Sequence, residues 1–246
     1  MKDYNKQNRN YTGGGWQQAQ AETWGGMQAV TAADAPLAER LTFVRKVYAL
    51  FFVGILCAIG GVLAGLMFPP VMVAIAQHPF ITLLLMLGGV MGAQAVRHVP
   101  GLNLAAFVGF TGLTGIVVSP AIYFYALYNP NSIWQAGIMT VGLFGGLTAY
   151  VFISKKDFSF LRGMVTTGLI ILVLGSVVNI FLGSSAVGFG IAVAALLLFA
   201  GYVLYDTSNI IRRYPTNEYI AGALSLYLDF WNIFLALLRI LNAGRR

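Results

Sequence analysis

The sequence predicts an all-α membrane protein, built as a bundle of seven transmembrane helices. Hydrophobic residues make up 58% of the 246 residues and charged residues only 9%, whereas a soluble domain carries about 25% charged residues. The apolar residues also form runs near the roughly 20 residues that a helix needs to cross a bilayer. Runs of this length exclude β-barrel strands of about 10 residues. So few charges exclude a soluble enzyme and a nucleic-acid-binding protein.

Seven apolar runs follow one another, separated by short polar or proline-containing breaks. They cover residues 47–68, 80–96, 104–125, 133–154, 164–182, 187–205 and 219–240. Residues 36–46 can start the first helix earlier. The seventh run carries Asp229 and Arg239, so it either spans the membrane or re-enters and returns to the same side. We favour a spanning helix.

Residues 1–38 differ from the rest of the chain. Gly, Gln and Ala dominate residues 11–30, with no helical or strand period and too little apolar mass for a core. We interpret residues 1–38 as a mobile N-terminal tail and residues 39–246 as the transmembrane domain.

The basic residues predict the orientation in the membrane. Nine of them lie before the first helix or in every second connection: Arg40, Arg45, Lys46, Arg97, Lys155, Lys156, Arg162, Arg212 and Arg213. The other three connections contain no Lys or Arg. Because cytoplasmic connections are enriched in these residues, the N-terminus is expected in the cytoplasm. Three C-terminal arginines, at positions 239, 245 and 246, depart from this pattern if the seventh helix spans.

Small residues four positions apart predict close helix packing. They occur at three places: Gly61/Gly65, Gly88/Gly92 and Gly142/Gly146. Such pairs let helix backbones approach one another in a membrane.

Two acidic residues stand out within apolar runs. Asp206 ends the sixth run in GYVLYDTSNII, and Asp229 lies mid-way along the seventh in LSLYLDFWNIF. A charge at this depth costs at least about 2.5–3.5 kcal/mol, so such residues face the bundle interior and mark a pathway or a proton relay. The alternative is a carboxylate that only bonds a neighbouring helix. The two acids can meet only if the sixth helix continues past Asp206 towards Ile211.

Several segments resemble the Bax inhibitor family, including its bacterial YccA-like members. They are AYVFISKKDFSFLRGM (149–164), LYDTSNIIRRYPTNEYI (204–220) and LSLYLDFWNIFLALLRIL (224–241). The resemblance implies a seven-helix bundle with a central seventh helix, in a bacterial inner membrane. Calcium-leak members carry a pH-sensing aspartate pair on helices six and seven, which falls on Asp206 and Asp229. An arginine that ends helix two latches the helix-six aspartate in those members, and Arg97 matches it in position.

Two functions remain open at this stage. The first is a pH-sensitive calcium leak channel, in which Asp206 and Asp229 bind the permeant ion. Calcium takes 6–8 oxygen ligands and two carboxylates supply at most four, so Ser208, Asn209, Ser225, backbone or water would complete the site. The second follows from the KKDFSFL and SNII stretches, which resemble the YccA branch. It is a regulator that binds and modulates the membrane AAA protease FtsH.

A third possibility, an intramembrane aspartyl protease, is disfavoured. Two buried aspartates can share a proton and activate water, but Asp229 lies in a YLDF context and not in a GxGD motif. We therefore expect no enzymatic activity, no cofactor and no catalytic residue. The expected partners are the lipid bilayer, calcium as a permeant ion and, on the second hypothesis, FtsH.

Overall fold

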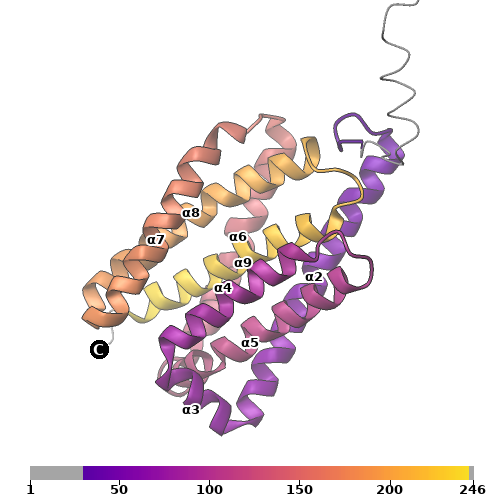
Figure 1. Cartoon of the computed structure of the whole chain (residues 1–246). Helices are drawn as coiled ribbons and strands as arrows, with labels where there is room; N and C mark the ends of the chain where they lie inside the picture. Colours follow the sequence, from indigo (N-terminus) through magenta and orange to yellow (C-terminus); the bar gives the residue numbers. More distant parts are fainter. Residues whose placement is uncertain (1–29, 244–246) are drawn as a thin grey trace, which may run out of the picture. The chain divides into compact units, whose positions relative to one another are not determined.

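The computed structural model describes residues 30–243, and that part of the chain is α-helical with no β-strand (Figure 1). Its helices are α2 (Leu37–Met67), α3 (Pro69–Gln77), α4 (Pro79–Ala95), α5 (Leu102–Tyr128), α6 (Pro130–Ser154), α7 (Arg162–Leu182), α8 (Ser185–Arg212) and α9 (Tyr219–Asn242). A short 3₁₀ helix, η1 (Ser159–Leu161), precedes α7. Six of these helices are long and apolar enough to cross a membrane, or seven if α3 and α4 form one broken span. The predicted all-α membrane bundle is confirmed.

The first helix is longer than a membrane span. α2 has 31 residues and begins directly after Pro36, as the sequence allowed. At 1.5 Å per residue it is about 46 Å long, whereas the hydrocarbon core of a bilayer is about 30 Å thick. The first turns of α2, which carry Arg40, Arg45 and Lys46, can therefore extend beyond the apolar layer.

The second predicted run forms α4, and an additional short helix, α3, precedes it. α3 and α4 meet at an angle of 99°, and each begins with a proline. The residue before each proline, Phe68 or His78, has a non-helical ψ of 76° or 60°, because proline clashes with a helical predecessor. The region around Pro69–Pro70, expected only as a break, thus starts a helix of its own.

Close backbone packing occurs where α2 crosses α5, the most extensive helix pair in the bundle. A Cβ added at Gly61 would overlap the carbonyl oxygen of Gly112. A Cβ at Gly65 would meet the side chain of Ser119. Nothing lies within 4 Å of a Cβ added at Gly88, Gly92, Gly142 or Gly146. The predicted close approach is therefore present at the first glycine pair and absent at the other two.

The last helix occupies the centre of the bundle. α9 packs against α2, α5, α6 and α8 (Figure 1), and 67% of its most apolar stretch is buried, against 39% or less in the other spans. It is one continuous helix of 24 residues, about 36 Å long at 1.5 Å per residue. Its last residue, Asn242, accepts a hydrogen bond from Asn129 at the α5–α6 connection, 3.0 Å away. The helix thus runs from one end of the bundle to the other, which favours a spanning helix over a re-entrant one.

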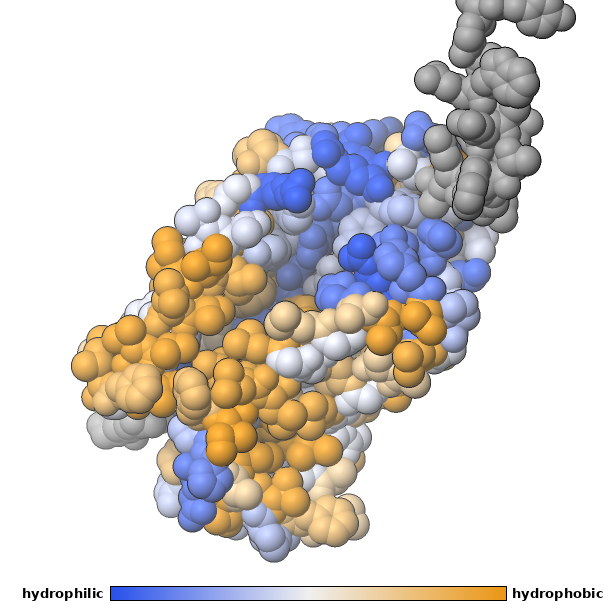
Figure 2. Space-filling model, viewed as in Figure 1, coloured by the Kyte–Doolittle hydropathy of each residue, from blue (hydrophilic) through white to orange (hydrophobic). Residues whose placement is uncertain are grey.

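At one end of the bundle, polar groups link the start of α2 with the α4–α5, α6–α7 and α8–α9 connections. We call this end the basic end (blue in the upper part of Figure 2). The guanidinium of Arg212 donates to the carbonyl of Lys155, and His98 lies 3.7 Å from Glu218. The backbone N–H of Ala32 donates to Tyr214, 2.9 Å away. Residues assigned to the tail thus already contact the α8–α9 connection from position 31. Residues 1–29, the rest of the predicted mobile tail, lie outside the described residues.

The two ends of the bundle predict the outcome of a topology test. The α5–α6 connection and the end of α9 lie together at the end opposite the basic end, so reporters fused after Asn131 and at the C-terminus should read the same side. A reporter fused after Lys156 should read the other side, which the positive-inside rule assigns to the cytoplasm. Phosphatase and fluorescent-protein fusions would measure this. A C-terminal reporter on the same side as Lys156 would contradict the spanning α9.

Candidate functional site

The two sequence-predicted aspartates come together between α8 and α9. α8 continues without a break to Arg212, which is the condition that the sequence set for their meeting. α8 and α9 are joined by a short connection and pack against each other. Asp206 is 9% exposed and Asp229 only 2% exposed, and they lie close enough for their charges to interact.

Asp229 has little compensation for its burial. Its Oδ2 atom is buried without a hydrogen-bond partner. Within residues 30–243, the ion pairs are His98 with Glu218 and Arg213 with Asp157, so neither buried acid has a cation within ion-pair distance. A buried polar atom without a partner costs about 1–3 kcal/mol, and a charged group costs more. Such a group indicates a functional constraint rather than an optimised core.

Two tyrosines that sequence reasoning missed lie beside the acids. Tyr202 on α8 and Tyr214 after α8 both lie near Asp206 and Asp229. The hydroxyl of Tyr214 is also 3.2 Å from the Ser225 hydroxyl on α9. Tyr202 could have been found from the sequence, because it lies four residues before Asp206 and therefore on the same helix face. Tyr214 follows the helix, and no spacing rule predicted its return to the pair.

A cavity of about 410 Å³ opens next to Asp206 at the basic end. Its lining comes from α7, α8, the α4–α5 connection and the connections that flank α7 and α8: Arg97, Ser159, Arg162, Tyr205, Asn209, Arg213, Tyr214, Pro215 and Glu218. Three of these side chains are arginines, so the cavity has a positive wall. Tyr214 both lines the cavity and interacts with the acid pair, and it therefore connects the two.

The α6–α7 connection is fixed against this cavity. Asp157 accepts hydrogen bonds from the Ser159 backbone N–H (2.9 Å) and the Arg213 guanidinium (2.8 Å), and these bonds lower its pKa to about 2. The Ser208 hydroxyl accepts the N–H of Phe158 at 3.1 Å. Ser208, one of the expected additional calcium ligands, is thus directed to this connection. Of the other two, Asn209 lines the cavity and Ser225 reaches the acids through Tyr214.

Three further buried hydroxyls meet between α2, α6 and α8. The Tyr48 hydroxyl interacts with those of Thr148 and Thr207, and all three atoms lack a geometrically good hydrogen-bond partner. Thr207 directly follows Asp206. A buried polar group of this kind is where a protein interior holds water, so buried polar atoms next to Asp206 extend from α8 to α2 and α6.

The family described as "Inhibitor of apoptosis-promoting Bax1" matches residues 40–246. The chain belongs to the Bax inhibitor family. The match covers every spanning helix and both buried aspartates. It confirms the family resemblance read from the three motif segments.

Relatives of this Bax inhibitor family chain come from bacteria, animals and viruses. It is similar to an uncharacterized membrane protein of Vibrio cholerae, at 39% identity over 69% of this chain and 78% of the relative. Mouse protein lifeguard 4 is 34% identical over 86% and 89% of the two chains. The Golgi anti-apoptotic protein of Vaccinia virus (strain Lister) is 31% identical over 88% and 91%. The long coverage indicates that the whole bundle is shared.

The third site residue expected from the Bax inhibitor family, Arg97, lies just after α4 at the mouth of the cavity. Its Nε donates to His98 Nε2 at 2.9 Å. In the described residues it forms no ion pair with Asp206, so its latch role stays a prediction.

Proposed function

We propose that this Bax inhibitor family chain is a pH-sensitive calcium leak pathway controlled by the Asp206–Asp229 pair. The observation that carries the proposal is Asp229, a 2%-exposed carboxylate beside a second one, with one oxygen lacking a partner. A pair of acids that only braced two helices would be expected to have its hydrogen bonds satisfied.

The chemistry of the pair supports a proton-controlled switch. Two interacting carboxylates titrate as one unit rather than as separate residues. With one shared proton they can bridge α8 and α9. Without it they are two like charges in a poorly solvated site, and they separate or recruit a cation. Calcium and protons then compete for the pair, and calcium flux rises with pH.

The geometry favours transit over storage. In residues 30–243 no three His, Cys, Asp or Glu side chains form a group that could hold a metal, so calcium meets two carboxylates. These supply at most four of the 6–8 oxygens that calcium takes. Conduction needs binding weak enough for the ion to leave, and a site this sparse meets that condition.

The arginine-lined cavity provides the control at the basic end. Arg97, Arg162 and Arg213 repel an entering cation as long as their charges face the cavity. The latch hypothesis adds a closed state in which Arg97 leaves His98 and pairs with Asp206.

The test is calcium flux into proteoliposomes between about pH 6 and about pH 8, a range that brackets a perturbed carboxylate. Wild type should conduct more at high pH. Asp206→Asn and Asp229→Asn should each remove most of that dependence, and the double variant should add little, because the two residues act as one unit. Asp34→Asn removes an exposed acid at the same end of the bundle that does not line the arginine-lined cavity, and it is the matched control.

Equal pH dependence in wild type and all three pair variants would overturn the proposal. If the reconstituted protein also carried no flux but co-purified with FtsH, the regulator hypothesis would replace it.

A further inference from the structure

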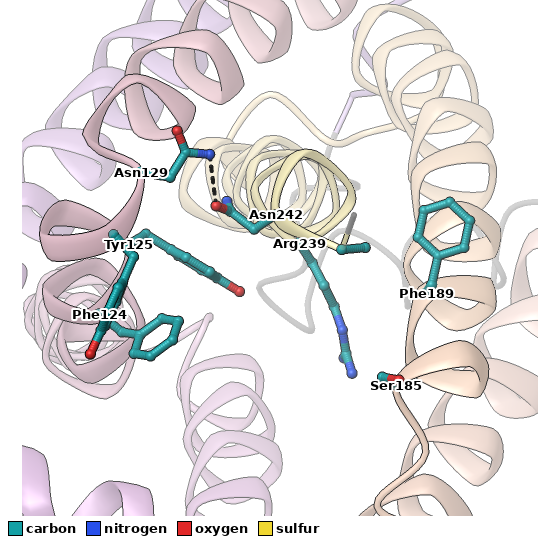
Figure 3. A pocket seen from close by; sticks show the side chains of 9 residues that line it. Phe124, Tyr125, Asn129, Ser185, Phe189, Arg239 and Asn242 are labelled. Atoms are coloured by element: carbon teal, nitrogen blue, oxygen red, sulfur yellow. Dashed lines mark hydrogen bonds between the residues drawn. The ribbon is translucent and has the colours of Figure 1, made fainter. Parts of the chain in front are cut away.

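A second cavity lies at the end of the bundle opposite the basic end. It measures about 480 Å³, within the roughly 300–1,000 Å³ of small-molecule sites. Its walls come from the end of α5, the start of α8 and the end of α9 (Figure 3): Phe124, Tyr125, Tyr128, Asn129, Ser185, Phe189, Arg239, Asn242 and Ala243. No acidic residue is among them. Neither Asp206 nor Asp229 lines it.

Arg239 supplies the only formal charge on these walls. Its side chain leaves α9 and extends across the cavity towards Ser185 (Figure 3). Within the described residues it pairs with no carboxylate. The basic connections gather at the other end of the molecule, so this arginine is an exception to the charge pattern. A cation without a counter-ion inside a cavity is a ready anion-binding group.

The neighbouring backbone is shaped to hold this side chain. The guanidinium lies directly on Gly188 of α8, where an added Cβ would be 3.0 Å from Arg239 Cζ and would overlap Nη2. The Asn179 amide reaches the same point from α7, and its Oδ1 is buried without a partner. Asn129 donates to Asn242 at 3.0 Å and ties the far wall together. Three helices, α7, α8 and α9, thus meet at the guanidinium.

The start of α8 adds a second favourable group. Ser185 is the first residue of this 28-residue helix, whose Ser184 cap accepts the N–H of Val187. The remaining N–H groups of the first turn attract anions. Arginine presents a planar fork of donors that matches the oxygens of phosphate. Phe124 and Phe189 give the cavity apolar sides (Figure 3). A phosphate group attached to an apolar body suits all three features.

We propose that this cavity binds a phosphate-bearing anion, held by Arg239 and the N-terminal turn of α8. A phospholipid headgroup and a free phosphate share this chemistry. The cavity is therefore a ligand site at the end of the molecule opposite the acid pair.

The experiment uses the full chain purified in neutral detergent. Native mass spectrometry would titrate phosphatidylglycerol, with phosphatidylcholine for comparison, and thermal unfolding would be followed with added inorganic phosphate. Arg239→Gln removes the charge, and Gly188→Ala displaces the guanidinium while the arginine is kept. Gly190→Ala, on the same helix with nothing within 4 Å of its added Cβ, is the control. The first two variants should bind at least about tenfold more weakly, the usual cost of losing a charged hydrogen bond.

Each outcome decides the proposal. Phosphatidylglycerol binding that Arg239→Gln and Gly188→Ala weaken, and Gly190→Ala does not, supports a lipid ligand. The same pattern with inorganic phosphate alone supports a free anion. Arg239→Lys, which keeps the charge without the fork, should retain part of the affinity and shows that loss in the glutamine variant is not misfolding. No binding of either probe by wild type, or unchanged binding in Arg239→Gln, overturns the site.

Discussion

Replacing Gly115 by alanine should strongly destabilise the bundle. A Cβ at this position would overlap the carbonyl oxygen of Ala58 and lie 2.8 Å from its carbonyl carbon and from the N atom of Val62. These are backbone atoms of α2, which cannot rotate away as a side chain could. Over-packing a tight core costs about 1–3 kcal/mol and occasionally more. Because α2–α5 is the most extensive helix pair, we expect the upper end of that range.

Thermal unfolding in detergent, with the fraction of monodisperse protein, would measure this effect. Gly112→Ala is the matched control, because its added Cβ would sit 3.8 Å from the carbonyl oxygen of Cys57, an ordinary contact. Gly109→Ala, with nothing within 4 Å, is the second. Both controls carry the same change in helix propensity. If Gly115→Ala and Gly112→Ala had equal unfolding temperatures, the described α2–α5 contact would be wrong.

Run length and apolarity were sufficient to predict the long helices, because a spanning segment must satisfy its own backbone hydrogen bonds, but they did not predict the short helix α3. They were not sufficient to predict where helices touch. Gly61/Gly65 and Gly142/Gly146 have the same spacing, yet only the first pair meets another backbone. Spacing defines a small-residue face on one helix, and the partner that fills it is set by the tertiary arrangement. The bend at His78–Pro79 could not be predicted either, because the sequence does not say which of its prolines begins a new helix.

The acid pair was predictable because each aspartate contradicts its own apolar surroundings. Asp206 and Asp229 could be found one at a time, without knowledge of the fold. Tyr214 could not, since its contact with Ser225 and its approach to the acids require the turn after α8. The cavity around Arg239, where we propose phosphate binding, was harder still to predict. Arg239 was noticed only as an anomaly in the charge pattern, and its cavity joins segments that the sequence keeps far apart.

Replacing Asp229 by leucine should stabilise the protein and abolish pH-dependent flux. The carboxylate is 2% exposed and one of its oxygens has no partner. Removing an unsatisfied buried polar group recovers about 1–3 kcal/mol, and buried charges replaced by apolar groups are often neutral or stabilising. The Asp229→Leu variant would therefore be as stable as wild type or more stable, although its pH-dependent flux is lost. A residue that served only the structure would show the opposite: its replacement would lower the stability and leave the flux unchanged.

Unfolding temperature and calcium flux, measured on one preparation, would test this relation for Asp229→Leu. Asp229→Asn should fall between wild type and leucine in stability, because its amide is uncharged but still polar. Asp34→Asn should change neither quantity much, since its carboxylate is exposed and bonds the nearby Thr31 hydroxyl. A clear loss of stability in Asp229→Leu, with Asp229→Asn unaffected, would mean that the carboxyl group bonds a neighbouring helix. The acid pair would then serve to hold α8 and α9 together, a role that needs hydrogen bonds but not a titratable charge.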